Sequence, residues 1–184
     1  MESYITSTQK QFAYYKQLGD QTLARLNFEQ MRWQYNAQSN SVNVIVKHLV
    51  GNMLSRWTQF YEEDGEKPWR QRDSEFEDEY TDKTAVLAHW EKGWDCLFAV
   101  INSLRPGDLT RIIYIRNQGH TVLEAINRQL CHYSYHIGQL VYLGRMIQGE
   151  SWESLSIPKN ESTAYNKAKF IQKKEKRHFT DDLY

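Results

Sequence analysis

Residues 129–145 read Gln129-Leu-Cys-His-Tyr-Ser-Tyr-His-Ile-Gly-Gln-Leu-Val-Tyr-Leu-Gly-Arg145, a pattern that predicts one amphipathic helix. Its two histidines, His132 and His136, are four residues apart and therefore share one face of that helix. Because one helical turn rises about 5.4 Å, both imidazoles can converge on a single divalent ion. Leu140 and Leu143 continue the same stripe, so this face should turn toward the interior of a helical bundle. The alternative is that both histidines only hydrogen-bond to neighbouring groups.

The composition limits the classes of partner. The 184 residues suit one domain that folds without disulfides or a structural metal. Because 23 basic and 23 acidic residues cancel, no overall charge favours nucleic acids or membranes, and we expect neither as a partner. Cys96 and Cys131 form no C-x-x-C pair, which is typical of a reducing compartment. Residues 1–10 lack the apolar core of a signal peptide, and no run reaches the length of a membrane span. The sequence predicts a cytoplasmic protein.

Apolar residues repeat at intervals of three and four along four parts of the chain, as they do in amphipathic helices. These parts span residues 4–26, 42–61, 84–104 and 122–148. Ser41 is placed to cap the second helix, while Pro106-Gly107 and Gly149 are placed to end the third and fourth. The pattern predicts an all-α protein with a four-helix bundle.

The connections between these helices differ in composition. Residues 27–40 are polar, and residues 62–82, rich in charge, are predicted to form a long surface loop. Residues 109–122 contain a β-branched run that favours a short β-hairpin before the last bundle helix, with its turn at residues 117–119. The long loop is expected to cross over the bundle.

The apolar pattern stops at Pro158, and the residues beyond it are polar and basic. Such a short basic run is more often a solvated segment than a binding patch. We therefore predict a metal-binding bundle at residues 1–158 and a basic, polar C-terminal tail at residues 159–184.

A third histidine, His48, lies on the apolar face of the second predicted helix. That face should meet the face of His132 and His136 in the bundle centre, where three imidazoles could surround one ion. Neutral nitrogen ligands suit Zn²⁺, Ni²⁺, Fe²⁺ or Cu²⁺, and three protein ligands leave positions open for water or substrate. The pattern fits equally well with His48 as a core histidine bonded to a carbonyl group.

Other residues fit a metal site less well. His120 precedes His132 by twelve residues, about 18 Å along a helix, and is expected to anchor the hairpin. His89 is expected at the surface, and His178 in the solvent-exposed tail. Cys131 diverges from His132 by about 100° around the helix, which favours a small buried apolar role.

Three segments together resemble a known family. They are Ser41-Val-Asn-Val-Ile-Val-Lys-His-Leu-Val-Gly-Asn-Met-Leu-Ser-Arg-Trp57, Asp64-Gly-Glu-Lys-Pro-Trp-Arg70 and Ala125-Ile-Asn-Arg-Gln-Leu-Cys-His-Tyr-Ser-Tyr-His-Ile-Gly-Gln139. The chain resembles the DinB/YfiT-like superfamily over roughly residues 1–158, and within it a branch described only as a domain of unknown function. The most specific feature is one histidine followed much later by H-x-x-x-H. The resemblance implies a four-helix bundle, often dimeric, that holds a divalent metal through His48, His132 and His136.

Characterised relatives in that superfamily include metal-dependent thiol transferases, isomerases and hydrolases. The resemblance therefore implies a thiol S-transferase-like enzyme that uses a divalent ion, zinc or nickel first, to activate a low-molecular-weight thiol. A metal-dependent hydrolase and a non-catalytic metal-binding or stress-associated bundle remain the alternatives, because a fold alone does not define an activity.

Two further expectations concern partners and supporting residues. An aromatic content of 14 % exceeds what a bundle of this size needs, so some rings should cover the interface of a homodimer. Asn52 and Gln129 lie one turn from His48 and His132, where they could orient a ligand or a small-molecule substrate. Otherwise, they make ordinary polar contacts inside the bundle.

Overall fold

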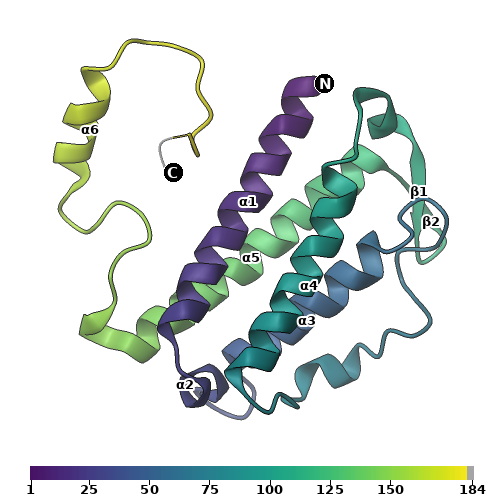
Figure 1. The fold of residues 1–184 in the computed structure, drawn as a ribbon, viewed down its shortest axis with the longest axis horizontal. Coiled ribbons are helices and arrows are strands. Elements are labelled where there is room, and N and C mark those ends of the chain that lie inside the picture. The colour runs from purple at the N-terminus through teal and green to yellow at the C-terminus, as the bar shows by residue number, and fades with distance from the viewer. Residues whose placement is uncertain (182–184) are drawn as a thin grey trace.

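A computed structural model describes residues 1–181. Four long helices, α1 (Glu2–Arg25), α3 (Val42–Trp57), α4 (Lys83–Ile101) and α5 (Val122–Gln148), form a bundle. Figure 1 shows α1 beside α5 and α3 beside α4, and these two pairs make the most extensive contacts between helices. The predicted all-α fold with a hairpin before the last bundle helix is confirmed.

The predicted caps are found at the start of α3 and at the end of α5, whereas α4 ends at Ile101, before the predicted Pro106-Gly107 stop. Ser41 Oγ accepts a hydrogen bond from the backbone N–H of Val44 at 3.2 Å, which confirms Ser41 as the N-cap of α3. Thr121 and Glu124 form a reciprocal capping box that starts α5. The helix ends at Gly149, whose φ of +56° favours a residue without a Cβ atom.

The core is unusually aromatic. Trp57, Trp90, Trp94 and Tyr133 are all almost fully buried between the four helices. Trp57 Nε1 donates to the hydroxyl of Tyr133 at 3.0 Å, and that hydroxyl donates to Asn52 Oδ1 at 3.0 Å. This hydrogen-bonded chain ties α3 to α5 and holds the Asn52 side chain in place.

Two connections contain structure that the sequence did not predict. The polar stretch after α1 includes a short helix, α2 (Phe28–Arg32), started by a capping box between Asn27 and Gln30. Helix α3 ends at Trp57, four residues earlier than predicted, because Thr58 is extended and Gln59 takes a positive φ of 47°. We refer to residues 58–82, between α3 and α4, as the 58–82 segment.

The prediction of a simple surface loop is wrong for part of the 58–82 segment. It contains a 3₁₀ turn, η1 (Asp73–Phe76), that packs against α3, and Lys67 and Glu75 are buried. Arg70 and Glu75 form an ion pair whose side chains are only 2 % and 6 % exposed. The sequence pattern was misleading here because charged residues are usually exposed, whereas Arg70 and Glu75 are buried as an ion pair.

The hairpin lies over one end of the bundle. After η2 (Pro106–Thr110), strands β1 (Ile112–Ile115) and β2 (Gln118–Thr121) pair in antiparallel register, with Ile115 opposite Gln118. The turn is Arg116-Asn117, whose φ angles are +54° and +60°, and not the predicted 117–119. Asparagine tolerates this left-handed conformation, and the Asp64 carboxylate accepts the N–H groups of both turn residues at 2.8 Å.

The chain after α5 forms a short 3₁₀ turn, η3 (Gly149–Ser151), and then helix α6 (Ser162–Phe170), which stands apart from the bundle in Figure 1. The chain then returns to α1, where His178 bonds to Ser7 and Phe179 contacts the ring of Tyr14. His178 is therefore half-buried and not solvent-exposed as predicted, because it packs on α1.

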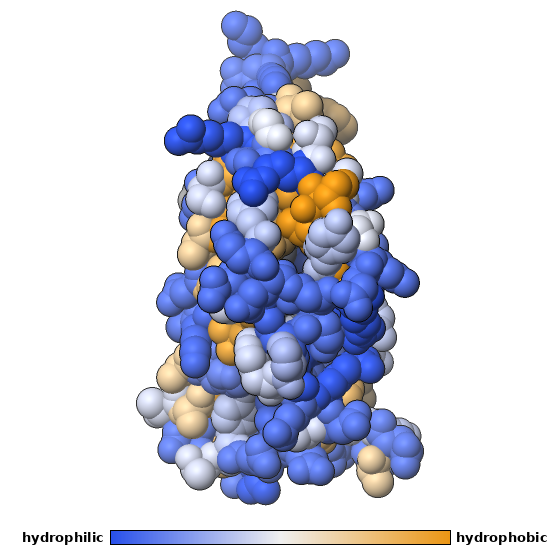
Figure 2. Space-filling model, turned by 90° about the vertical axis from the view of Figure 1, so that its right-hand side faces the viewer, coloured by the Kyte–Doolittle hydropathy of each residue, from blue (hydrophilic) through white to orange (hydrophobic). Residues whose placement is uncertain are grey.

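Within the described residues, none of the helices has the length and apolar character needed to cross a membrane. Figure 2 shows the side that carries the hairpin and the 58–82 segment, where hydrophobic residues form only small, separated groups among polar ones.

Candidate metal centre

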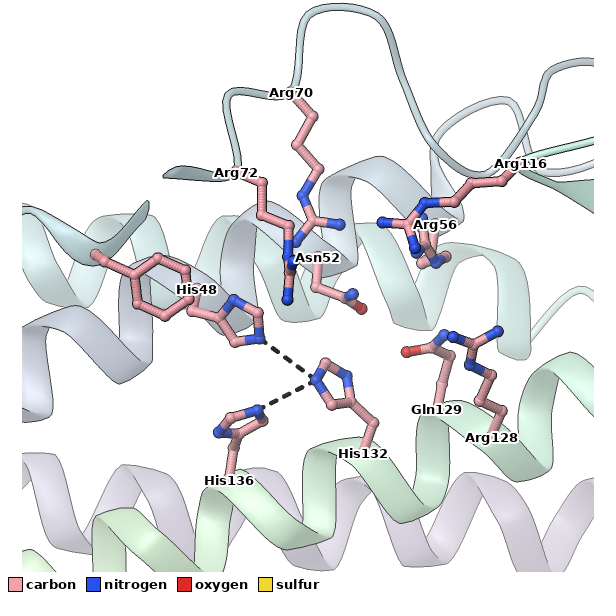
Figure 3. Close-up of a pocket in the computed structure, with 11 residues that line it drawn as sticks. His48, Asn52, Arg56, Arg70, Arg72, Arg116, Arg128, Gln129, His132 and His136 are labelled. Atoms are coloured by element: carbon pink, nitrogen blue, oxygen red, sulfur yellow. Dashed lines mark hydrogen bonds between the residues drawn. The ribbon is translucent and has the colours of Figure 1, made fainter. Parts of the chain in front are cut away.

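Three histidines from two helices converge at one point of the bundle. We call His48, on α3, with His132 and His136, on α5, the histidine triad. The Nε2 atom of His132 lies 3.4 Å from Nε2 of His48 and 3.1 Å from Nε2 of His136 (Figure 3). The predicted i, i+4 pair and the predicted third histidine are thus brought together, although helix α3 precedes α5 by many residues.

These distances fit a metal ion. Zinc–nitrogen bonds of about 2.0–2.1 Å at tetrahedral angles separate two nitrogen ligands by about 3.3 Å. The two observed separations, 3.4 and 3.1 Å, bracket that value, and one ligand atom from each residue lies within 4.8 Å of the others. The triad could therefore hold a divalent ion with little rearrangement of the side chains.

The rings of His48 and His136 are each oriented by a hydrogen bond at Nδ1, which turns Nε2 toward His132. Nδ1 of His48 lies 2.9 Å from Oε2 of Glu75, and an ionised carboxylate can only accept, so Nδ1 carries the proton. Nδ1 of His136 lies 2.7 Å from the amide oxygen of Gln139 and also donates. In the neutral form of each ring, the unprotonated nitrogen is then Nε2, which faces His132 in the arrangement that a metal requires.

The charge states of the two histidines on α5 also suit a cation. Burial, followed by repulsion from His136 and His48, lowers the pKa of His132 to about 3. Burial likewise lowers the pKa of His136. Both rings are therefore neutral at pH 7, and neutral imidazole is the form that binds metals.

Glu75 and Arg70 support His48 from the 58–82 segment. Arg70 Nε donates to Glu75 Oε1 at 2.7 Å, and its Nη2 donates to Oε2 at 3.0 Å. Burial raises the pKa of the Glu75 carboxyl, but the hydrogen bonds from His48 and Arg70 outweigh burial and the pKa is lowered. Gly51 makes room for this carboxylate, because a Cβ atom there would lie 2.3 Å from Oε1 of Glu75.

A cavity of about 340 Å³ opens in front of the triad. Its walls combine the three histidines, two amides, one phenyl ring and five guanidinium groups (Figure 3). The remaining lining residues are Asn52, Arg56, Arg70, Arg72, Phe76, Arg116, Arg128 and Gln129. The cavity is large enough for a small polar molecule beside the triad.

Asn52 and Gln129, singled out from their spacing, both line the cavity. Asn52 Oδ1 accepts from Tyr133, so part of its role is the ordinary polar contact considered above. Gln129 differs, since its side chain is buried while Oε1 has no hydrogen-bond donor within residues 1–181.

The remaining polar candidates lie away from the triad. His120 sits in β2 opposite Ile113, in the hairpin where it was expected. His89 is half-buried and not at the surface, because its Nδ1 bonds to the hydroxyl of Tyr80 at 2.5 Å. Cys131 is exposed, so the expected buried apolar role is wrong; its position on α5 points away from the core that Tyr133 fills.

Sequence reasoning missed the supporting residues Glu75 and Arg70 and the arginines of the cavity wall. Helical periodicity cannot place Arg70, Arg72 and Glu75, because these three residues belong to the 58–82 segment. One signal was present: that segment carries Asp64–Arg70, one of the stretches on which the family resemblance rests.

The comparisons with known proteins give a family but no activity. A family model described as "Protein of unknown function (DUF1572)" matches residues 1–161. A search of curated proteins and a search of solved structures gave no match. The matched range contains the four bundle helices, the hairpin, the 58–82 segment and the whole histidine triad. The chain therefore belongs to the DUF1572 family of proteins of unknown function.

Proposed function

We propose that this protein is a divalent-metal-dependent enzyme of the DinB/YfiT type whose ion is held by the histidine triad. The observation that carries the proposal is the convergence of the three histidines beside an open cavity, with Nε2 of His132 lying 3.4 Å from that of His48 and 3.1 Å from that of His136. Three imidazole nitrogen ligands suit zinc or nickel. A site that only stored or structured a metal would be expected to recruit a fourth side chain, whereas the side of this triad that faces the cavity is free for a substrate.

Thiol S-transfer is the reaction we favour, on a low-molecular-weight thiol. A bound divalent ion would lower the pKa of a coordinated thiol, so that the nucleophile forms near neutral pH. The guanidinium groups of the wall would stabilise that thiolate and orient the rest of the thiol substrate. Glu75 is a positioning residue, because its contact with His48 keeps the correct nitrogen turned toward the ion.

Metal binding is tested first. After reconstitution with zinc or nickel, we expect about one ion per chain by elemental analysis, and loss of the ion in His48→Ala, His132→Ala and His136→Ala. The matched control is His89→Ala, which removes a half-buried histidine outside the triad. If all three triad variants kept full stoichiometry, the assignment of the site would be wrong.

Activity is tested on protein loaded with cobalt, whose visible spectrum reports its ligands. Addition of a small thiol should produce a sulfur-to-cobalt charge-transfer band, and the loaded enzyme should then transfer the thiol to a model electrophile. His132→Ala should lose both signals, while His89→Ala keeps them. Hydrolysis of ester or amide substrates without a thiol band would instead assign a hydrolase, and a loaded protein inert in both assays would favour the non-catalytic bundle.

A further inference from the structure

The five arginines of the cavity wall share very few acidic partners. Glu66 Oε2 accepts from Arg56 at 3.1 Å and from Arg116 at 3.1 Å, and it lies 3.5 Å from Nη1 of Arg70. Arg70 has a second partner in Glu75, as described above. Glu66 and Glu75 therefore pair with three of the guanidinium groups, and neither carboxylate lines the cavity.

The other two arginines, Arg72 and Arg128, have no acidic partner within residues 1–181, although both line the cavity. In Figure 3 they come from opposite walls, Arg72 from the 58–82 segment and Arg128 from α5. Counting Asp64, whose carboxylate interacts with Arg56, five positive groups still outnumber three negative ones, and a concave site with such an excess concentrates anions. The formal net charge of the whole protein is zero, so this positive charge is a local feature of the cavity.

Gln129 gives an independent sign of a ligand. Its side chain is only 3 % exposed, and its Oε1 atom lacks a donor in the described structure. Figure 3 shows this oxygen turned into the cavity, between Arg128 and the histidines. Buried polar atoms are normally hydrogen-bonded, so the missing donor is expected to belong to the molecule that fills the cavity.

We propose that the cavity binds a small anionic substrate whose carboxylate or phosphate group lies between Arg72 and Arg128, with a hydroxyl or N–H group that donates to Gln129. Guanidinium groups match both anions through paired N–H donors. The reactive end of the same molecule then reaches the histidine triad. This placement of the reactive end rests on the proposed metal-dependent function, whereas the anion site does not.

The anion site is tested on metal-free protein, so that an ion cannot bind the probes directly. Titration calorimetry with inorganic phosphate and with succinate should show binding to one site per chain. Arg72→Gln and Arg128→Gln should each weaken binding about tenfold, because each removes a charge-assisted contact to the anion. Arg145→Gln is the matched control: it removes an exposed arginine from α5 outside this cavity, and affinity should stay within twofold.

Two further arms define the chemistry. If phosphate binds more tightly than succinate, the anionic group of the substrate is assigned as a phosphate; if succinate binds more tightly, it is assigned as a carboxylate. Tartrate, which adds hydroxyl donors to succinate, should bind more tightly than succinate to the wild-type protein and lose that advantage in Gln129→Met.

The anion site and the metal site can fail separately. His132→Ala should lose the ion and keep its affinity for the anion, while Arg72→Gln and Arg128→Gln should keep the ion. The proposal is overturned if both arginine variants bind the probes within twofold of wild type, or if the probes bind only to metal-loaded protein.

Discussion

Replacing Glu75 by glutamine should weaken metal binding without removing any ligand. The amide has one acceptor oxygen, whereas the carboxylate accepts from both His48 and Arg70. If the amide oxygen turns to Arg70, its NH₂ group faces Nδ1 of His48. His48 must then carry its proton on Nε2, the atom that should bind the ion. If the oxygen turns to His48 instead, the NH₂ group opposes the donors of Arg70.

Residues that orient a metal-binding histidine typically contribute 10- to 100-fold in affinity, about 1.4–2.7 kcal/mol. Because Glu75 is nearly inaccessible to water and bonds directly to His48, we expect Glu75→Gln to fall in this range. The matched control is Glu79→Gln, which makes the same chemical change at an exposed carboxylate paired with Lys47. It should leave metal affinity unchanged.

The assay is competition for zinc with a chromophoric chelator at fixed pH. Urea unfolding of the metal-free proteins, measured beside it, separates lost stability from lost affinity. The reasoning would be refuted if Glu75→Gln bound zinc within twofold of wild type while His48→Ala did not bind it.

Three other predictions follow from the same structure. Gly51→Ala should mimic Glu75→Gln in the zinc competition assay, since its methyl group must displace the Glu75 carboxylate; wild-type affinity would contradict this. The free energy of unfolding of the metal-free protein should fall as pH is lowered from about 6.5 toward 3. In this range His132 is protonated in the unfolded chain, whereas its pKa of about 3 keeps it neutral in the folded protein. Urea titrations across this range should show a smaller loss in His132→Gln, and an equal loss would count against it. We also propose a homodimer, since Tyr135 and Tyr142 expose 63 % and 65 % of their surface on α5; sedimentation should find a dimer that Tyr142→Glu dissociates, and a wild-type monomer at micromolar concentration would exclude it.

The long helices were predictable because their signals are local. Helix α5 begins and ends at the predicted residues 122 and 148, where a threonine cap and a glycine bound one continuous stripe. The predictions were wrong or incomplete in the connections between the long helices, where no apolar periodicity is present. The α2 helix is five residues long, too short for a stripe, and the hairpin turn shifted to Arg116-Asn117 because register and φ angles, not composition, select the turn.

The sequence by itself determined the candidate ligands, since four-residue spacing places His132 and His136 on one face and the apolar neighbours of His48 turn it inward. Only the tertiary structure decided what surrounds them. Glu75, Arg70 and Arg72 come from a segment without periodicity, and Arg128 from the exposed side of the cavity mouth. Helical spacing is set by hydrogen bonds between residues four apart and can be read locally. The partner of a charge in an irregular segment depends on how distant parts of the chain pack, and that is fixed only when the bundle forms.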